Sequence, residues 1–455
     1  MSPLPTDRPL LAWYGDDFTG ASGVLEAMTF GGVGAVLFLG LPTADQLARF
    51  AGYGAVGIAG IARSQSPAWM DRELPPVFRF LEGLGAAITQ YKVCSTFDSS
   101  PTVGSIGHAY DLAAPILAGR WTPMLVAAPG NSRFQVFGNL FASVGATGYR
   151  IDRHPTMSRH PVTPMTEADL GRHLARQTDA EIGLVDIVAM RRGTAGEALA
   201  RELERGARIV SLDVIDPETL AEAGRLVWET RGQRLFAIAS QGLNYALLAH
   251  WYAAGLLAEP AAPPVMPRAA RIACVSGSCS PVTADQIAWA ETNGFRAIRL
   301  DVAPAAVGGR PWQAALAAAA DSAAAAASEG ADPLVFTARG PDDGAVAALN
   351  AAIAVAGADT GAVNALIGQG LGRLLADVLA RTGARRGIIA GGDTSSHATT
   401  ELGVYALTAL APTDTPGAAL FRAHADAPEA DGLEVALKGG QMGSPDYFGR
   451  MRGGA

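Results

Sequence analysis

Lysine and cysteine are both scarce in this chain, and each shortage carries information. Only two of the 35 basic residues are lysines, Lys92 and Lys438, so arginine supplies nearly all of the positive charge. A lysine that is retained in such an arginine-rich chain indicates a site that needs a compact point charge, because a planar guanidinium does not imitate an ammonium. The alternative is that the two lysines are present by chance. The three cysteines, Cys94, Cys274 and Cys279, are too few for a disulfide framework, which is typical of a reducing cytoplasm.

Long apolar runs and a secretory signal are also missing. No apolar stretch approaches the ~20 residues that a membrane span needs. Residues 1–10, MSPLPTDRPL, lack a basic segment followed by an apolar one. The formal net charge of −8 argues against nucleic acid as the main partner. We therefore expect a cytoplasmic protein that binds neither membranes nor nucleic acid, in which an anionic small substrate would need a local cationic pocket.

Short apolar runs separated by helix-length segments predict an α/β fold with two domains, because 455 residues are too many for one core. The four prolines of EPAAPPVMPR, residues 259–268, interrupt this pattern and indicate a semi-rigid linker. We expect domains over 1–258 and 269–455, each with a mostly parallel sheet flanked by helices. Alanine-rich residues 312–330 are expected to form a packing helix. The expected strands are 10–14, 35–39, 55–60, 88–94, 124–128, 181–187, 208–214, 235–240, 271–281, 295–301, 333–338, 386–392, 403–410 and 434–440.

Two adjacent aspartates, Asp16 and Asp17, directly follow the first expected strand. Ligands of open α/β sheets bind beyond the carboxyl ends of the strands, so these carboxylates are candidates for a site. Thr19 is a candidate for the cap of the following helix, and Gly20 permits close approach of the backbone. Arg63 stands in a similar position after a later strand. The alternatives are structural. One aspartate would cap the helix while the other has no role, and Arg63 would be an ordinary solvent-exposed arginine.

Lys92 lies inside an expected strand, where burial of an ammonium without a counter-charge is costly. A nearby aspartate or a substrate carboxylate would explain it. The segment that follows, STFDSSP, supplies Ser95 and Asp98 as further candidate contacts. Gly104 and Gly107 then introduce a helix whose amide N–H groups are expected to receive an anion.

Further polar candidates lie between residues 128 and 170. Asn131 and Arg133 are expected in a turn, with Arg133 as a candidate substrate contact. His160 is a second candidate in the loop that follows. His154 and His160 are six residues apart, which matches no standard metal spacing, so we expect polar loop residues and no metal site.

Three loops of the second domain are rich in glycine and serine, and each leaves an expected strand: 275–290, 389–402 and 437–448. Such loops suit close approach of backbone N–H groups to phosphates, although any one of them alone also fits an ordinary turn. Their recurrence favours a nucleotide site. No GxxxxGK[ST] loop is present, and GQGLGR does not have the GxGxxG spacing, so the site is of another type. The candidate contacts are Ser276, Ser278, Gly391, Gly392, Asp393, Thr394, Lys438, Gly439 and Gly440.

The order of these motifs resembles the four-carbon acid sugar kinase family. The resemblance rests on GDDFTGA, YKVCSTFDSSPTVGSIG, HPVTPMTEADL, SGSCSPVT, GGDTS and LKGGQMGSPDYF, and it covers most of the chain. It implies an N-terminal domain that binds a four-carbon sugar acid and a C-terminal domain that binds ATP. The reaction it implies is phosphorylation of a hydroxyl of a 3-oxo-tetronate, a threonate or an erythronate.

The resemblance also implies roles for single residues. The acid-sugar side would be Asp17, Arg63 and Lys92, and the ATP side would be Ser276, Gly391 to Thr394, and Gly440. The chain departs from the family where Ser396 and His397 stand in place of a common glycine, and where KGGQMG replaces KSGNFG. These departures concern the shape of the nucleotide loops.

Phosphoryl transfer needs positioning, charge neutralisation and a group that orients the attacking hydroxyl. Asp17 is the candidate for orienting or deprotonating that hydroxyl, and Asp16 would be structural or would help to hold Mg²⁺ through ATP. Arg63 and Lys92 would clamp the substrate carboxylate. A non-catalytic regulator that binds a sugar acid or a nucleotide, and a lyase or isomerase acting on a sugar acid, stay open as alternatives. A homodimer that exchanges domains through the linker is a hypothesis.

Overall fold

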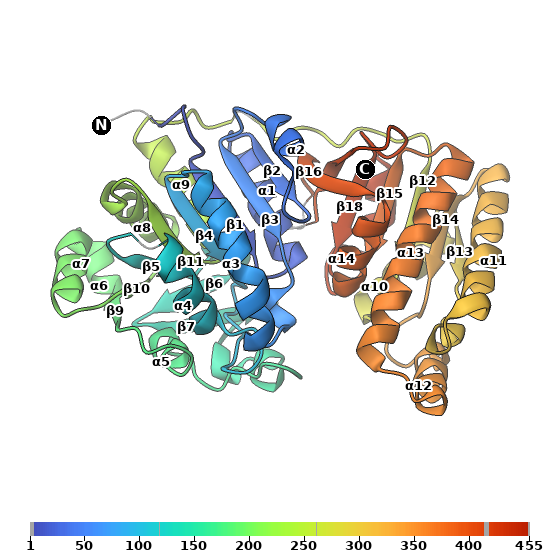
Figure 1. Ribbon diagram of the computed structural model, residues 1–455, viewed down its shortest axis with the longest axis horizontal. Coiled ribbons are helices and arrows are strands. Elements are labelled where there is room, and N and C mark those ends of the chain that lie inside the picture. The colour runs from blue at the N-terminus through green and yellow to red at the C-terminus, as the bar shows by residue number, and fades with distance from the viewer. Residues whose placement is uncertain (1–3, 118, 261, 414–417, 454–455) are drawn as a thin grey trace. The chain divides into compact units, whose positions relative to one another are not determined.

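The computed structural model describes residues 4–117, 119–260, 262–413 and 418–453. The chain divides into two compact units, Met1–Ala261 and Ala262–Ala455 (Figure 1). Each unit contains a mostly parallel sheet flanked by helices, so the predicted fold class is confirmed. Within the described ranges, no helix combines the length and the apolar character needed to cross a membrane.

The main sheet of the first unit has the strand order β2-β3-β1-β4-β11-β5-β10-β9, and its strand pairs are parallel. β1 lies between β3 and β4, so that Gly15 is opposite Ala59 on one side and Lys92 on the other. Because parallel strands end at one edge of the sheet, the loops after these three strands meet there. The strands are β1 (Leu11–Gly15), β2 (Ala35–Phe38), β3 (Ala55–Ala59), β4 (Ile88–Lys92), β5 (Thr122–Leu125), β9 (Ile182–Val185), β10 (Ile209–Leu212) and β11 (Leu235–Ala239).

Helices flank this sheet (Figure 1), and α3 (Pro67–Gly83) shows how the sequence encodes the packing. Ser66 caps its first turn, Pro67 occupies the first helical position, and Met70, Leu74, Phe78 and Leu81 are buried at helical spacing. The ring of Phe78 packs edge-on against Tyr14 of β1 and Tyr91 of β4. The other helices are α1 (Phe18–Phe30), α2 (Ala44–Ala48), α4 (Ile106–Leu117), α5 (Leu170–Leu174), α6 (Ile187–Arg192), α7 (Ala195–Glu204), α8 (Pro217–Thr230) and α9 (Gly242–Ala253).

A small antiparallel sheet, absent from the sequence prediction, is inserted after β5. It consists of β6 (Arg133–Val136), β7 (Asn139–Val144) and β8 (Thr147–Arg150). Arg133 therefore begins a strand, and its expected place in a turn is wrong. The expected strand 124–128 is also displaced, since β5 ends at Leu125 and Ala128 instead exchanges backbone hydrogen bonds with Arg133.

The sheet of the second unit has the order β13-β14-β12-β15-β18-β17-β16. Its first five strands pair in parallel, and β17 runs antiparallel to both neighbours. β17 is a strand that the sequence prediction missed. The strands are β12 (Ile272–Ser276), β13 (Phe295–Arg299), β14 (Asp332–Phe336), β15 (Arg386–Ala390), β16 (Val404–Ala411), β17 (Leu420–Ala425) and β18 (Glu434–Lys438).

The alanine-rich segment of the second unit is helical, as predicted. It forms α11 (Gly309–Ser328), whose buried side includes Trp312 and several alanines, because alanine has the highest helix propensity and lets helix and sheet approach closely. The other helices of this unit are α10 (Pro281–Glu291), α12 (Gly344–Ala356), α13 (Thr360–Thr382), α14 (Gly392–Glu401) and α15 (Tyr447–Arg452).

Candidate active site

The two aspartates that follow β1 have different environments. Asp17 is the N-cap of α1, and its Oδ1 accepts a hydrogen bond from the backbone N–H of Gly20 at 3.0 Å. Thr19 lies within the first turn, so the expectation that it caps the helix is wrong. Asp16 is only 3% exposed, whereas the side chain of Asp17 is 29% exposed. Asp17 is therefore the more accessible carboxylate of this pair.

Arg63, from the short 3₁₀ helix η1 (Ala62–Ser64) after β3, contacts both aspartates. Its Nε and Nη2 donate to Oδ2 and Oδ1 of Asp16 at 3.2 and 2.6 Å, and Nη2 also donates to Oδ1 of Asp17 at 2.6 Å. Burial raises the pKa of Asp16 to about 6, and the charge of Arg63 opposes that rise. The edge of the guanidinium that binds a carboxylate in bidentate fashion is thus occupied by Asp16.

Lys92 is the last residue of β4 and is 1% exposed. Its Nζ donates a hydrogen bond to the carbonyl of Val93 at 2.7 Å. Burial lowers the pKa of Lys92, while the negative charges of Asp17 and Asp16 act in the opposite direction. Among the described residues, no carboxylate forms an ion pair with this ammonium. Two of its three N–H donors are consequently available to a ligand.

The loop after β4 carries Ser95, which is half-buried, and Asp98, which is 7% exposed. The hydroxyl of Thr96 donates to Oδ1 of Asp98 at 2.5 Å. Burial alone would raise the pKa of Asp98, but the charge of Arg63 and the bond from Thr96 hold it below its ordinary value. Phe97, between them, has a φ of 57°, a left-handed conformation that a non-glycine residue rarely adopts.

A network of side-chain hydrogen bonds holds the loop after β4 in place. Ser99 lies 3.0 Å from Nε2 of His173 and accepts a bond from the side-chain amide of Gln177 at 2.9 Å. Gln177 Oε1 also accepts the backbone N–H groups of Ile106 and Gly107, the first residues of α4, at 2.8 and 3.3 Å. The expectation that this helix end receives an anion is therefore wrong, because a glutamine of the protein already occupies it.

Arg133 has no carboxylate partner among the described residues. Its Nη1 donates to the carbonyls of Asn131 and Ser132, both at 3.1 Å, and its Nε is buried without a partner. Burial lowers the pKa of Arg133. A partly buried guanidinium that contacts only neutral carbonyls retains affinity for an anion.

His154 and His160 belong to a short repeat, Arg-His-Pro, that occurs twice with a spacing of six residues. Each follows a 3₁₀ helix, η3 (Ile151–Arg153) or η4 (Met157–Arg159). Nδ1 of His154 accepts the backbone N–H groups of residues 156 and 157, and Nδ1 of His160 accepts that of Thr163 at 3.1 Å. The ring proton of each therefore resides on Nε2. In the described part of the chain, no cluster of His, Cys, Asp and Glu fits a metal ion.

In the second unit, the loops after β12, β15 and β18 meet at the carboxyl edge of the sheet. The hydroxyls of Ser280 and Thr283 both donate to the carbonyl of Gly440, the latter at 3.0 Å, which ties the first loop to the third. A side chain at Gly277 would place its Cβ 2.2 Å from Oγ1 of Thr394, so the second loop packs on a bare backbone. Ser276 and Ser278, like Thr394, are buried at this junction.

Lys438 ends β18 and is 1% exposed. Its Nζ donates to the hydroxyl of Thr283 at 3.2 Å and to the carbonyl of Gly439 at 3.1 Å. It forms no ion pair with any carboxylate that the structure describes. Burial lowers the pKa of Lys438 to about 8. This lysine resembles Lys92 in its place at a strand end, in its burial and in its lack of an anionic partner.

The remaining predicted contacts of the second unit fall on the same edge. Gly391 has a φ of 129°, and its N–H donates to the carbonyl of Lys438 at 2.9 Å. Gly392 begins α14 and is exposed, and Gly439 follows β18 directly. The side chain of Asp393 lies outside the described part of the chain. Sequence reasoning missed Thr283, although its position three residues after Ser280 fits a helix cap whose hydroxyls remain near the loop.

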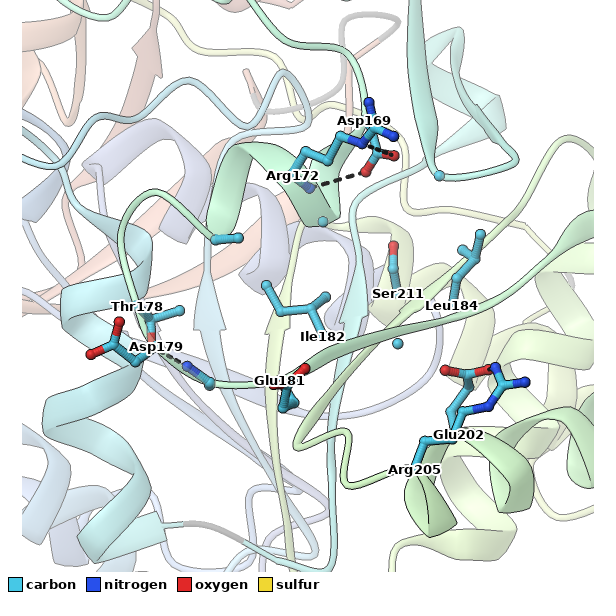
Figure 2. A pocket seen from close by; sticks show the side chains of 15 residues that line it. Asp169, Arg172, Thr178, Asp179, Glu181, Ile182, Leu184, Glu202, Arg205 and Ser211 are labelled. Atoms are coloured by element: carbon cyan, nitrogen blue, oxygen red, sulfur yellow. Dashed lines mark hydrogen bonds and ion pairs between the residues drawn. The ribbon is translucent and has the colours of Figure 1, made fainter.

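The first unit also has a cavity of about 670 Å³, which lies beside β9, the last strand in the order of its sheet. Figure 2 shows that each of its two arginines lies beside a carboxylate: Arg172 is 3.7 Å from Asp169, and Arg205 is 2.9 Å from Glu202. These basic groups are already neutralised within the cavity wall. Lys92 and Arg133 are not among its lining residues, so this cavity is not the candidate site.

A parallel α/β unit with a cationic, carboxylate-bearing edge is followed by an α/β unit with glycine-serine loops around a buried lysine. This arrangement defines a two-domain α/β protein with a candidate anion site in each domain. Residues 11–247 match the family described as "Sugar-binding N-terminal domain", and residues 273–448 match the "Nucleotide-binding C-terminal domain". The chain belongs to the four-carbon acid sugar kinase family, as the motifs predict.

Full-length relatives agree with this assignment. A protein of Paraburkholderia graminis named 3-oxo-isoapionate kinase is 49% identical over 98% of this chain and 94% of its own length. A Methylobacterium radiotolerans protein named 3-oxo-tetronate kinase is 34% identical over 97% and 98%. A solved structure from Salmonella typhimurium LT2, described as a tRNA synthase, has a TM-score of 0.79 at 25% identity and covers 97% of this chain and 98% of its own. The chain is a kinase, and the prediction of an enzyme of this class is confirmed.

Proposed function

We propose that this kinase transfers the terminal phosphoryl group of ATP to a hydroxyl of a 3-oxo sugar acid. The observation that carries the proposal is the pair of buried lysines, Lys92 and Lys438, each at the carboxyl end of a strand. Neither forms an ion pair with a described carboxylate. Because a buried ammonium is costly without a compensating anion, each lysine marks a place for one: the substrate carboxylate at Lys92 and the nucleotide phosphates at Lys438.

The relatives guide the choice of substrate. The relative named for 3-oxo-isoapionate shares 49% of its residues with this chain, and the one named for 3-oxo-tetronate shares 34%. A 3-oxo sugar acid is common to both names. We therefore place 3-oxo-isoapionate first among the substrates to test and 3-oxo-tetronate second, ahead of threonate and erythronate.

On the sugar-acid side, Asp17 is the group that orients or deprotonates the hydroxyl. Its Oδ1 is held by Gly20 and Arg63, and its side chain is the exposed member of the aspartate pair. Lys92 and Arg133 contact the carboxylate of the substrate, as a point charge and a planar fork respectively. Ser95, Asp98 and His160 are further contacts for the hydroxyls and the oxo group.

On the nucleotide side, the phosphates lie against the three glycine-serine loops, with Lys438 as their cation. Backbone N–H groups at such loops and at helix N-termini bind phosphate without a P-loop. The contacts are Ser276, Ser278, Gly391, Gly392, Asp393, Thr394, Gly439 and Gly440. The loops fit a phosphate, because their bare glycines leave backbone uncovered beside a buried cation.

Mg²⁺ bound together with ATP would be held by the nucleotide phosphates and by one or two carboxylates, which is its usual environment in proteins. Asp16 has both carboxylate oxygens on Arg63 and is therefore structural rather than a magnesium ligand. Bound Mg²⁺ would neutralise phosphate charge. Residues 1–258 and 269–455 act as the sugar-acid and nucleotide domains in this proposal, with 259–268 as the linker.

A coupled assay of ADP release tests the proposal. The protein is offered ATP, Mg²⁺ and one acid at a time: 3-oxo-isoapionate, 3-oxo-tetronate, threonate or erythronate. We expect ADP release that depends on a 3-oxo acid, with one phosphate transferred per ADP formed. Consumption of the acid without ATP would instead support a lyase or isomerase, and binding of the acid without turnover would support a regulator.

A further inference from the structure

The position of Arg63 relative to the two aspartates assigns it a role other than substrate binding. Its Nε and Nη2 are both on Asp16, and Nη2 is shared with Asp17. Two backbone hydrogen bonds hold this arrangement. The N–H of Arg63 donates to the carbonyl of Asp16 at 2.9 Å, and the N–H of Asp16 donates to the carbonyl of Lys92 at 3.0 Å. The three strand ends are thus tied together around one guanidinium.

Charge is the first consequence of this contact. Two adjacent carboxylates, one of them buried as Asp16 is, repel each other, and a cation that contacts both favours their ionised forms. Arg63 is that cation: burial alone would lower its pKa, and the two aspartates hold the pKa above its ordinary value. A general base has to be unprotonated, and Arg63 is the cation that contacts both carboxylates of the pair to which Asp17 belongs.

Geometry is the second consequence. Oδ1 of Asp17 accepts bonds from Nη2 of Arg63 and from the N–H of Gly20, at 2.6 and 3.0 Å. No described residue donates to Oδ2. With one oxygen fixed by two donors, the carboxylate has a single orientation, and Oδ2 is the oxygen that faces a ligand.

We infer that Arg63 is a positioning residue, which compensates the charge of the aspartate pair and presents Oδ2 of Asp17 to the substrate hydroxyl, rather than a ligand of the substrate carboxylate. This inference rests on the proposed function. In the step concerned, the hydroxyl oxygen forms a bond to the terminal phosphorus of ATP, the bond from that phosphorus to the ADP oxygen breaks, and the hydroxyl proton passes to Oδ2 of Asp17.

The test measures kcat and KM for the sugar acid between pH 5 and 9 in the full chain. Arg63→Lys keeps the charge but loses the fork that spans two carboxylates, and Arg72→Lys, an exposed arginine on α3, is the matched control. We expect kcat of Arg63→Lys to fall about 10²-fold through misplacement of the base, with KM within a few-fold. Arg63→Ala should move the acidic limb of the pH profile of kcat to higher pH. Added guanidinium should partly restore both the value of kcat and the position of that limb.

The shift of the limb has a definite sign. The charged or titratable groups that interact with Arg63 or Asp16 include Asp17, Lys92, Cys94, Asp98, Tyr14 and Tyr91. Removing the cation among them raises the pKa of the aspartate pair, so activity is lost at a higher pH on acidification. Asp16→Asn is a second variant with the opposite expectation, because it removes a negative neighbour of Asp17 and leaves Arg63 to it alone. The limb should then move to lower pH.

The outcomes separate this inference from the proposed function. If wild-type protein releases no ADP with any of the acids, the proposed function fails and the role of Arg63 falls with it. If wild-type protein is active and Arg63→Lys raises KM about 10- to 100-fold with kcat and the limb unchanged, Arg63 binds the substrate carboxylate and the inference is overturned. An unmoved limb in Asp16→Asn would overturn it even if both Arg63 variants failed to fold.

Discussion

Lys92 and Gly20 lie so close together that no side chain fits between them. A Cβ at residue 20 would be 2.8 Å from Nζ of Lys92 and 2.3 Å from Oδ1 of Asp17. Gly20 is therefore glycine because a carboxylate and an ammonium from two different strand ends converge on its Cα. The same contact explains why the motif after β1 has a glycine three residues after the aspartate that caps the helix.

The first prediction concerns Gly20→Ala. The added methyl group must displace the carboxylate of Asp17 or the ammonium of Lys92, so we expect kcat/KM to fall about 10²-fold or more. Gly83→Ala, at the end of α3, is the control, since a Cβ there meets nothing within 4 Å. It should leave activity unchanged and slightly raise the thermal midpoint. Wild-type activity in Gly20→Ala would contradict the convergence of these groups at the reacting centre.

The second prediction separates recognition from catalysis at Asp17. Asparagine caps a helix as well as aspartate does, so Asp17→Asn keeps the bond to the N–H of Gly20. We expect the affinity for the sugar acid to stay within a few-fold and kcat to fall by roughly 10²–10⁴, the usual range for a lost general base. ATP affinity, measured by calorimetry, should be unchanged. Near-normal kcat with a raised KM would make Asp17 a recognition residue, and Asp393 would be the next candidate for the base.

The third prediction concerns Lys92. Removing a cation from a carboxylate that is bound alike in the ground and transition states raises KM and leaves kcat. For Lys92→Ala we expect KM for the sugar acid to rise about 10- to 100-fold, the range for a hydrogen bond to a charged group. Lys92→Arg should not fully restore it, because the guanidinium is longer and planar and Gly20 leaves no room. An equal loss of kcat in both variants would place Lys92 at the transition state instead.

The fourth prediction uses the fixed tautomer of His160. Gln places a donor nitrogen near the position of Nε2, whereas Asn keeps only an acceptor near Nδ1 for the N–H of Thr163. If Nε2–H donates to the substrate, His160→Gln should keep KM within a few-fold and His160→Asn should raise it up to about tenfold. Nitrogen-15 spectra of the wild-type ring give an independent check, because Nδ1 should resonate as an unprotonated nitrogen. The reverse order of the two variants would assign His160 a structural role only.

Much of this candidate site could be predicted from the sequence, because its residues belong to short local sequence patterns. Apolar runs that end in Asp16 or contain Lys92 indicate strands with polar carboxyl ends, and the sheet topology brings such ends together. The scarcity of lysine in an arginine-rich chain draws attention to both strand-end lysines. The loops of the second unit were predicted for a similar reason, since glycine and serine after a strand indicate close backbone approach.

Contacts between distant segments could not be predicted in this way. Arg63 meets Asp16 across 47 residues and Gln177 caps α4 across about 70, and no local pattern encodes either pairing. The β6–β7 hairpin was missed because its turn, at Phe137 and Gly138, has an aromatic residue at a positive φ of 47°. Its stabilising group is Asp213, whose carboxylate accepts the N–H groups of both turn residues from a strand end far along the chain.

The fifth prediction concerns Lys438, whose burial lowers its pKa to about 8 from an ordinary value of 10.5. Between these two values the unfolded chain binds more protons than the folded one, so the free energy of unfolding of the wild type should rise with pH across that window. Below pH 8 the folded protein bears the cost of a buried charge. Lys438→Met removes that cost, and its thermal midpoint should exceed that of the wild type at pH 7, with the difference shrinking towards pH 10.5.

The same substitution should weaken nucleotide binding, because the charge that destabilises the fold is the one that we propose to receive the phosphates. We expect calorimetry to show ATP affinity reduced about 10- to 100-fold in Lys438→Met at pH 7. In the wild type, affinity should decline as pH rises above 8 and Lys438 loses its proton, whereas the variant should show no such decline. A variant that is more stable at pH 7 yet binds ATP as the wild type does would mean that the phosphates lie elsewhere. A variant with lower stability at pH 7 would instead mean that the bonds from Nζ to Thr283 and Gly439 outweigh the cost of burying the charge.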